Sequence, residues 1–188
     1  MSNTRRLATD AVLVALYTVL TVFVSIRAGN LHISLASLPV VVCALLYGPT
    51  DACVIAVLGE FMNQMLTYGF TVTTPIWILP PAVRGLVIGL AAAAALKRGR
   101  LLERQILRYY VVCLAAGLAT TLANTGGIWL DSVLLGYYSE AYVFGDFTVR
   151  VITSIVTVAV VSTAAMPVAM ALRKAGFGIR KPVTAVNI

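Results

Sequence analysis

The chain has 188 residues and a formal net charge of +7; 60% of its residues are hydrophobic and 11% are charged. Soluble domains carry about 25% charged residues, and a mean hydropathy of +0.95 leaves more apolar surface than one soluble domain of this size can bury. This composition excludes a soluble globular protein. It also excludes nucleic acid as a partner, because the basic residues fall in short segments between apolar stretches, as they do in membrane proteins.

The first apolar stretch covers residues 8–26 and follows a pair of arginines. Its length is close to the roughly 20 residues that cross a bilayer as a helix, so we expect it to be the first membrane span. Ala8, Ala11 and Ala15 form a stripe of small residues on this helix, and small residues let a second helix approach closely. From the sequence, that second helix belongs either to the same bundle or to another protein.

Two shorter apolar stretches, 33–47 and 51–66, predict the second and third spans. Gly48 and Pro49 separate them, and this dipeptide strongly breaks helices. Pro39 also interrupts the first of the two stretches. Short or proline-interrupted helices in transporters often mark the place where substrate is held, so we expect this part of the chain to lie near a binding site.

Three longer apolar stretches predict the remaining spans, at residues 75–96, 109–130 and 147–172. The six spans predict an all-α polytopic membrane protein, with a single integral membrane domain over residues 1–188 that forms a six-transmembrane-helix bundle. The basic segment 97–108 is predicted to be cytoplasmic, as are both termini, because lysine and arginine collect on that side of the membrane. An even number of spans agrees with this orientation.

The segment 131–146 then lies outside the cell, at a prokaryotic plasma membrane. It is the longest of the expected outer segments, and it contains Tyr137, Tyr138, Tyr142 and Phe144. These aromatic residues are explained either by an interfacial belt or by a lid over a ligand.

Polar side chains inside a membrane are expensive and usually functional. In the expected topology, polar residues of four helices fall at a similar depth in the outer half of the membrane, which indicates a common outward-facing pocket. Aromatic residues near the outer helix ends would form its walls. The candidate substrate-binding residues are Glu60, Asn63, Gln64, Tyr68, Trp77, Arg84, Asn124, Trp129 and Arg150.

Each of these residues also has a structural explanation. Arg84 can pair with Glu60 as a bridge between two helices, and Arg150 can extend its long side chain to the outer interface. Asn124 can hydrogen-bond between helices, and the tryptophans can belong to an aromatic belt. The sequence leaves these alternatives open.

The motifs of common catalytic sites are missing from the sequence. It contains no P-loop GxxxxGK[ST], no HExxH and no GxSxG, and His32 is its single histidine. We therefore expect no enzymatic activity, no metal site and no cofactor. Binding or transport is the function class that remains.

Four stretches of the chain carry a resemblance to a known family. They are Ala11-Val12-Leu13-Val14-Ala15, Ile33-Ser34-Leu35-Ala36-Ser37-Leu38-Pro39, Leu46-Tyr47-Gly48-Pro49 and Arg84-Gly85-Leu86-Val87-Ile88-Gly89. Together with the chain length, the six spans and the basic termini, they make the chain similar to the substrate-binding S component of an energy-coupling factor (ECF) vitamin transporter.

The resemblance implies a division of labour. Such an S component binds a vitamin at its outer face and docks through its first helix onto a transmembrane coupling subunit, which two ATPase subunits carry. It is then thought to topple in the membrane and release the vitamin inside. Ala8, Ala11 and Ala15 would form the docking surface, and the ATPase motif missing from this chain would be supplied by its partners.

Within the family, the stretches 33–39 and 46–49 are most similar to the folate branch. Residues 68–75 differ from that branch, which tends to have an acidic residue and a Pro-Gly-Phe-Thr stretch there. Folate is the leading substrate, with pantothenate, riboflavin, pyridoxine and cobalamin as alternatives. Outside the family, the alternatives are a structural membrane protein, such as a cell-shape determinant, and a self-sufficient small transporter.

Overall fold

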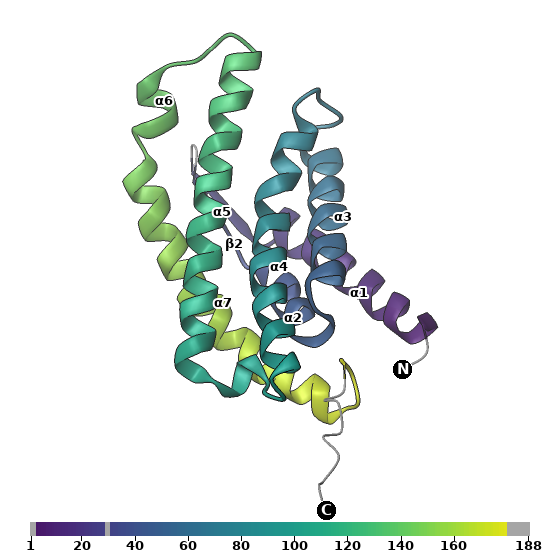
Figure 1. Cartoon of the computed structure of the whole chain (residues 1–188). Coiled ribbons are helices and arrows are strands. Elements are labelled where there is room, and N and C mark those ends of the chain that lie inside the picture. The colour runs from purple at the N-terminus through teal and green to yellow at the C-terminus, as the bar shows by residue number, and fades with distance from the viewer. Residues whose placement is uncertain (1–2, 29–30, 180–188) are drawn as a thin grey trace, which may run out of the picture.

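The computed structural model describes residues 3–28 and 31–179, and it shows a bundle of long helices (Figure 1). This confirms the prediction of an all-α, six-helix membrane bundle, to which a short hairpin, a 3-10 turn and one short helix are added. The elements are α1 (Asn3–Val22), β1 (Ser25–Ala28), β2 (Leu31–Ser34), α2 (Ser37–Tyr47), α3 (Pro49–Thr67), α4 (Thr74–Lys97), η1 (Leu102–Arg104), α5 (Ile106–Leu134), α6 (Glu140–Phe144) and α7 (Phe147–Lys174).

The long helices follow the predicted apolar stretches, but α5 is longer at both ends. It begins at Ile106 rather than 109 and ends at Leu134 rather than 130. Asp131 therefore lies in the last turns of a helix instead of in a loop. By length and composition, three helical stretches in the described part of the chain can cross a membrane, and α2 is a shorter apolar helix. The three are Thr74–Lys97, Ile106–Leu134 and Glu140–Lys174.

The structure corrects the prediction at the first connection. The first helix ends at Val22 instead of continuing to residue 26, and the second helix begins at Ser37. Between them, β1 and β2 pair as an antiparallel hairpin. The stretch 27–32, which separates the first two predicted spans, includes residues 29 and 30, which lie outside the described residues. Hydropathy, on which the predicted spans rest, does not distinguish a short apolar strand from a helix.

The two ends of the bundle differ in what they carry (Figure 1). One end, here called the basic end, holds the start of α1, the 98–105 connection between α4 and α5, and the end of α7. The opposite end, the far end, holds the α3–α4 connection and α6. Arg173 of α7 ties the basic end together, because it pairs with Glu103 of η1 and donates to the Leu45 carbonyl of α2.

α4 lies close to the start of α3 because glycines remove the side chains that would separate them. Gly48 has a φ of 93°, which favours glycine, and the chain reverses there between α2 and α3. A Cβ added at Gly89 would lie 2.4 Å from Pro49 Cα, and one added at Gly85 would lie 3.0 Å from the Ala52 backbone. The distance at Gly89 leaves no room for a side chain, and at Gly85 the neighbouring backbone would have to shift.

α1 has one face against the bundle and one face turned away from it. Tyr17 is 4% exposed, and its ring covers Gly59 of α3, where an added Cβ would lie 2.5 Å from the ring. Ala8, Ala11 and Ala15 are all exposed. The stripe of small residues therefore faces away from the bundle, which disfavours the alternative that it packs within the same bundle.

Candidate functional site

A cavity of about 690 Å³ lies between α1, α3, α4, α5 and α7, and the connections at the far end contribute to its walls. Its volume falls in the range of small-molecule binding sites. Every predicted substrate-binding residue except Trp129 lines it. These residues are Glu60, Asn63, Gln64, Tyr68, Trp77, Arg84, Asn124 and Arg150. Polar residues from four helices thus converge on one space, and their contact with a ligand stays a prediction.

Trp129 does not line the cavity. Its side chain is 46% exposed on the outside of α5. It stands one position, or about 100° of helix rotation, from Ile128, which does line the cavity. The structure thus places Trp129 outside the cavity, and the aromatic-belt alternative fits its position better than the pocket does.

Glu60 organises the wall that α3 contributes. Its Oε2 accepts a hydrogen bond from the Tyr17 hydroxyl at 2.7 Å. Its Oε1 accepts from Asn63 Nδ2 at 2.9 Å and from Gln64 Nε2 at 3.0 Å. The four side chains are between 2% and 8% exposed, so this network satisfies polar groups that would otherwise be costly to bury.

Arg84 reaches the cavity from α4 without an acidic partner. Its Nε donates to Thr120 Oγ1 of α5 at 3.4 Å. Among residues 3–28 and 31–179, both ion pairs lie at the basic end and neither includes Arg84. The alternative bridge between Arg84 and Glu60 is therefore not formed, and the guanidinium contributes positive charge to the cavity.

Arg150 points inward from the first turn of α7. It is 6% exposed, which contradicts the alternative that it extends to the outer interface. Its Nη2 donates to the Val143 carbonyl of α6 at 2.5 Å, and its Nη1 donates to Thr125 Oγ1 at 3.4 Å. Its Nε is buried without a hydrogen-bond partner in the described structure. Arg150 is thus a buried cation with hydrogen-bonding capacity left over.

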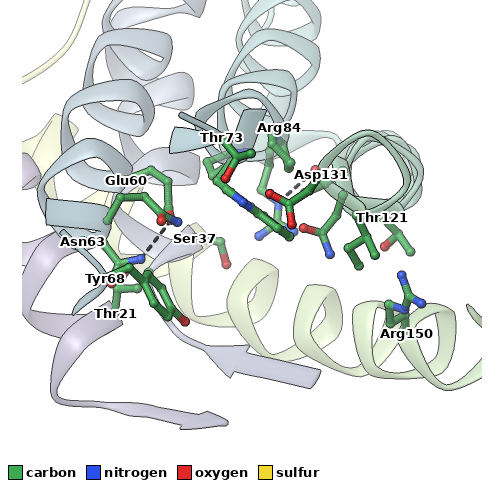
Figure 2. Close-up of a pocket in the computed structure, with 18 of the residues that line it drawn as sticks. Thr21, Ser37, Glu60, Asn63, Tyr68, Thr73, Arg84, Thr121, Asp131 and Arg150 are labelled. Carbon is green, nitrogen blue, oxygen red and sulfur yellow. Dashed lines mark hydrogen bonds between the residues drawn. The ribbon is translucent and has the colours of Figure 1, made fainter. Parts of the chain in front are cut away.

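The two kinds of polar group occupy different sides of the cavity. Figure 2 shows Glu60 and Asn63 on one side, Thr121 and Arg150 on the other, and Arg84 between them. The side that α5 and α7 contribute is rich in hydroxyl groups, from Thr120, Thr121, Thr153, Ser154 and Thr157. An elongated ligand would therefore meet a cationic, hydroxyl-rich wall at one end and an amide-rich wall at the other.

The sequence did not identify one further residue of this site. Asp131 is 7% exposed and lines the cavity, although its position after the apolar run suggested an outer loop. It accepts a hydrogen bond from the Tyr137 hydroxyl, and the rings of Tyr137 and Tyr142 meet edge to face at 5.5 Å. The spacing of Asn124, Ile128 and Asp131, which places all three on one helix face, was the signal that would have found this carboxylate.

For part of the segment 131–146, the structure favours a lid over a ligand rather than an interfacial aromatic belt. Tyr142 of α6 lines the cavity, and the Val143 carbonyl of α6 is held by Arg150. Tyr137 and Tyr138 are each 44% exposed, and Phe144 is 54% exposed. The segment thus covers part of the cavity with one aromatic ring while it keeps others on its outer surface.

Comparison with known proteins relates nearly the whole chain to one group of transporters. The model of the family described as "ECF-type riboflavin transporter, S component" matches residues 1–174. No curated protein sequence matches the chain.

Two solved structures have a similar fold. A crystal structure of FolT bound with folic acid is 18% identical in sequence, with a TM-score of 0.65 over 90% of this chain and 97% of that one. The S component of a bacterial ECF transporter is also 18% identical, with a TM-score of 0.54 over 93% of this chain and 96% of that one. At this identity, the likeness is one of fold.

Proposed function

This chain belongs to the family of ECF-type riboflavin transporter S components, and from that membership we propose that it captures a vitamin for an ATP-driven importer. The vitamin enters the cavity from the far end of the bundle. A transmembrane coupling subunit and two ATPase subunits, which are separate chains, supply the energy. The cavity itself, with two arginines that have no acidic partner in the described structure, is the observation that carries this proposal.

The arginines favour an anionic vitamin. A guanidinium in a cavity away from water is stabilised by a carboxylate, which it can bind through two parallel hydrogen bonds. Folate and pantothenate carry carboxylates, whereas riboflavin and pyridoxine carry none. We therefore propose a folate-like substrate and retain riboflavin, which the description of the family names, as the alternative.

Trp77 and Tyr68 support a substrate with a flat ring. Both line the cavity, and aromatic faces stack on planar rings. A pterin fits this requirement together with the carboxylates of its tail, whereas pantothenate has no ring. The combination of a ring and an anion in one molecule is what distinguishes folate among the candidates.

Isothermal titration of the purified protein in detergent tests the proposal. Folic acid, riboflavin, pantothenate, pyridoxine and cobalamin are titrated separately, and we expect folic acid to bind most tightly. Binding of riboflavin without binding of folic acid would contradict the folate assignment but keep the vitamin-capture function. A protein that binds none of the five would contradict the function itself.

The exposed face of α1 supports docking on the coupling subunit. Ala8, Ala11 and Ala15 leave a shallow surface on which a partner helix can approach closely. Tyr17 holds the opposite face of α1 against α3, so the helix is anchored while its small residues stay accessible. We propose that this face contacts the coupling subunit.

A further inference from the structure

We propose that Glu60 is a positioning residue that makes the α3 wall of the cavity a hydrogen-bond acceptor. This wall would select ligands that carry an amino group on a planar heteroaromatic ring. The inference rests on the proposed function, because it concerns the same cavity, and it specifies which edge of a ligand meets which wall.

The argument begins with the direction of two amides. Glu60 Oε1 lies 2.9 Å from Asn63 Nδ2 and 3.0 Å from Gln64 Nε2. A carboxylate only accepts hydrogen bonds, so each amide has to turn its NH2 group toward Glu60. The amide orientation is thus fixed by chemistry: both carbonyl oxygens point away from Glu60.

The two carbonyls then have different surroundings. Asn63 Oδ1 accepts from Thr67 Oγ1 at 3.2 Å. Gln64 lines the cavity, and its Oε1 meets no donor among the residues that the structure describes. A ligand N–H is therefore the partner that would complete the hydrogen bonding of Gln64.

Glu60 itself acts through its neighbours. Both of its oxygens already accept hydrogen bonds, and the Tyr17 hydroxyl at 2.7 Å fixes the second oxygen. Tyr17 is in turn held against Gly59. The carboxylate is therefore anchored, and its effect on a ligand passes through the Gln64 carbonyl.

The opposite wall fixes the other end of the ligand. Arg150 lies across the cavity from Glu60 in Figure 2, with its Nε unpartnered in the described structure. A molecule with an anionic group at Arg150 and a ring amino group at Gln64 would satisfy both walls at once. The geometry thus points to an amino-substituted heteroaromatic acid as the ligand class.

Two probes that differ at a single ring position test the inference. Pterin-6-carboxylate has a ring amino group where lumazine-6-carboxylate has an oxygen, and both carry the same carboxylate. The ratio of their dissociation constants, measured by titration calorimetry, reports how strongly the α3 wall prefers a ligand that donates a hydrogen bond to it. We expect the unmodified protein to bind the pterin at least ~10-fold more tightly, because lumazine-6-carboxylate has a second acceptor where the pterin has its amino donor, and a site built to accept a hydrogen bond there rejects a ligand without that amino group.

Three variants separate positioning from direct contact. Glu60→Met frees both amides and is expected to reduce the preference below ~3-fold. Gln64→Met removes the acceptor while it leaves Glu60 in place, and it is expected to do the same. Glu60→Gln is expected to keep the preference, because its oxygen can still face the amides while its NH2 group turns to the Tyr17 hydroxyl, which can accept.

Each contrary result overturns the inference in a distinct way. An unchanged ratio in Gln64→Met shows that Gln64 is not the acceptor. Equal loss in Glu60→Gln and Glu60→Met shows that the charge of Glu60, and not its hold on the amides, selects the ligand. If the unmodified protein binds neither probe but does bind riboflavin or folic acid, the inference fails while the proposed function stands; if it binds none of these, both fail.

Discussion

Arg84 and Arg150 bring positive charge to the same cavity, but they are held to different degrees. Arg150 is held at two points, by the Val143 carbonyl and Thr125. Arg84 has one long hydrogen bond, to Thr120 at 3.4 Å. Arg84 therefore has more freedom to adjust to an anionic ligand, whereas Arg150 offers a fixed point of attachment that also connects the cavity with α6.

The clearest test at the residue scale is Arg84→Ala. We expect it to weaken folic acid binding by at least ~2 kcal/mol, about 30-fold, because a buried carboxylate of the ligand would lose its cationic partner. Titration calorimetry measures this loss. Arg104→Ala, an exposed arginine at the basic end, is the matched control and should leave the affinity unchanged.

A structural role for Arg84 predicts a different pattern. If Arg84→Ala lowered the melting temperature and left the affinity unchanged, the binding role would be wrong. Because no ion pair joins Arg84 to Glu60 in the described structure, we also expect the double variant with Glu60→Ala to show no recovery of stability.

The residues of this site were predictable to the extent that membrane burial makes polar groups expensive. Glu60, Asn63 and Arg84 stand out in apolar helices for that reason, and all three line the cavity. Asp131 did not stand out because it follows the last apolar residue of its stretch. The orientation of Trp129 was not predictable either, since an aromatic residue at a helix end is equally suited to a pocket and to the membrane interface.

At the scale of helices, two stretches that carried the family resemblance turn out to touch. Gly85 and Gly89 of α4 lie against Ala52 and Pro49 at the start of α3. The sequence Leu46–Pro49 and the sequence Arg84–Gly89 are therefore two sides of one contact. This contact holds α3 and α4 together below the cavity, so it sets the spacing between Glu60 and Arg84.

Replacement of Gly89 by alanine tests this contact. The added Cβ would lie 2.4 Å from Pro49 Cα, a backbone atom that has little room to move. We expect Gly89→Ala to destabilise the protein by about 1–3 kcal/mol, as overpacking does, and to lower its melting temperature in detergent.

Gly126→Ala is the matched control for this prediction. Gly126 is an exposed helix glycine, and nothing lies within 4 Å of an added Cβ. Alanine is the better helix former, so this variant should be neutral or slightly stabilising. Equal melting temperatures for the two variants would contradict a close helix contact at Gly89.

The hairpin between α1 and α2 is the element that the sequence analysis missed. Ile26 of β1 and Ile33 of β2 are β-branched, and such residues fit a strand as well as they fit a membrane helix. Hydropathy counted them as parts of the first and second spans, since it measures apolar character and not backbone conformation. The boundaries of α3, α4 and α7 were predicted better because glycine, proline and charged residues flank those helices.

The second prediction at the scale of helices concerns the proposed docking face of α1. In the double variant Ala11→Trp with Ala15→Trp, large side chains would hold a partner helix several ångströms away. We expect folic acid binding by the purified protein to persist and vitamin uptake by cells to be abolished. Leu122→Trp serves as the control, because Leu122 is 62% exposed but belongs to α5; its uptake should stay close to that of the unmodified protein.

If uptake survived in the Ala11→Trp, Ala15→Trp double variant, α1 would not be the docking face. Loss of binding in the purified variant would point instead to a disturbed cavity, since Tyr17 on the opposite face of α1 lines it. The paired measurement of binding and uptake is therefore needed to interpret the variant.

For the whole molecule, the two ends of the bundle have opposite charge. The basic end holds Lys97, Arg98, Arg100 and Arg104 in or beside the α4–α5 connection. The far end holds Glu140 and the other acidic residues near α6. Because short cytoplasmic segments collect basic residues, we infer that the basic end faces the cytoplasm and that the cavity opens outward.

Cysteine labelling in intact cells tests this orientation. Arg100→Cys and Glu140→Cys are made in a protein whose native cysteines, Cys43, Cys53 and Cys113, are replaced by serine or alanine. A membrane-impermeant thiol reagent should label position 140 from outside and reach position 100 only after the membrane is permeabilised. The opposite pattern would place the cavity on the cytoplasmic side, where capture of an external vitamin is impossible, and would overturn the proposed function along with the topology.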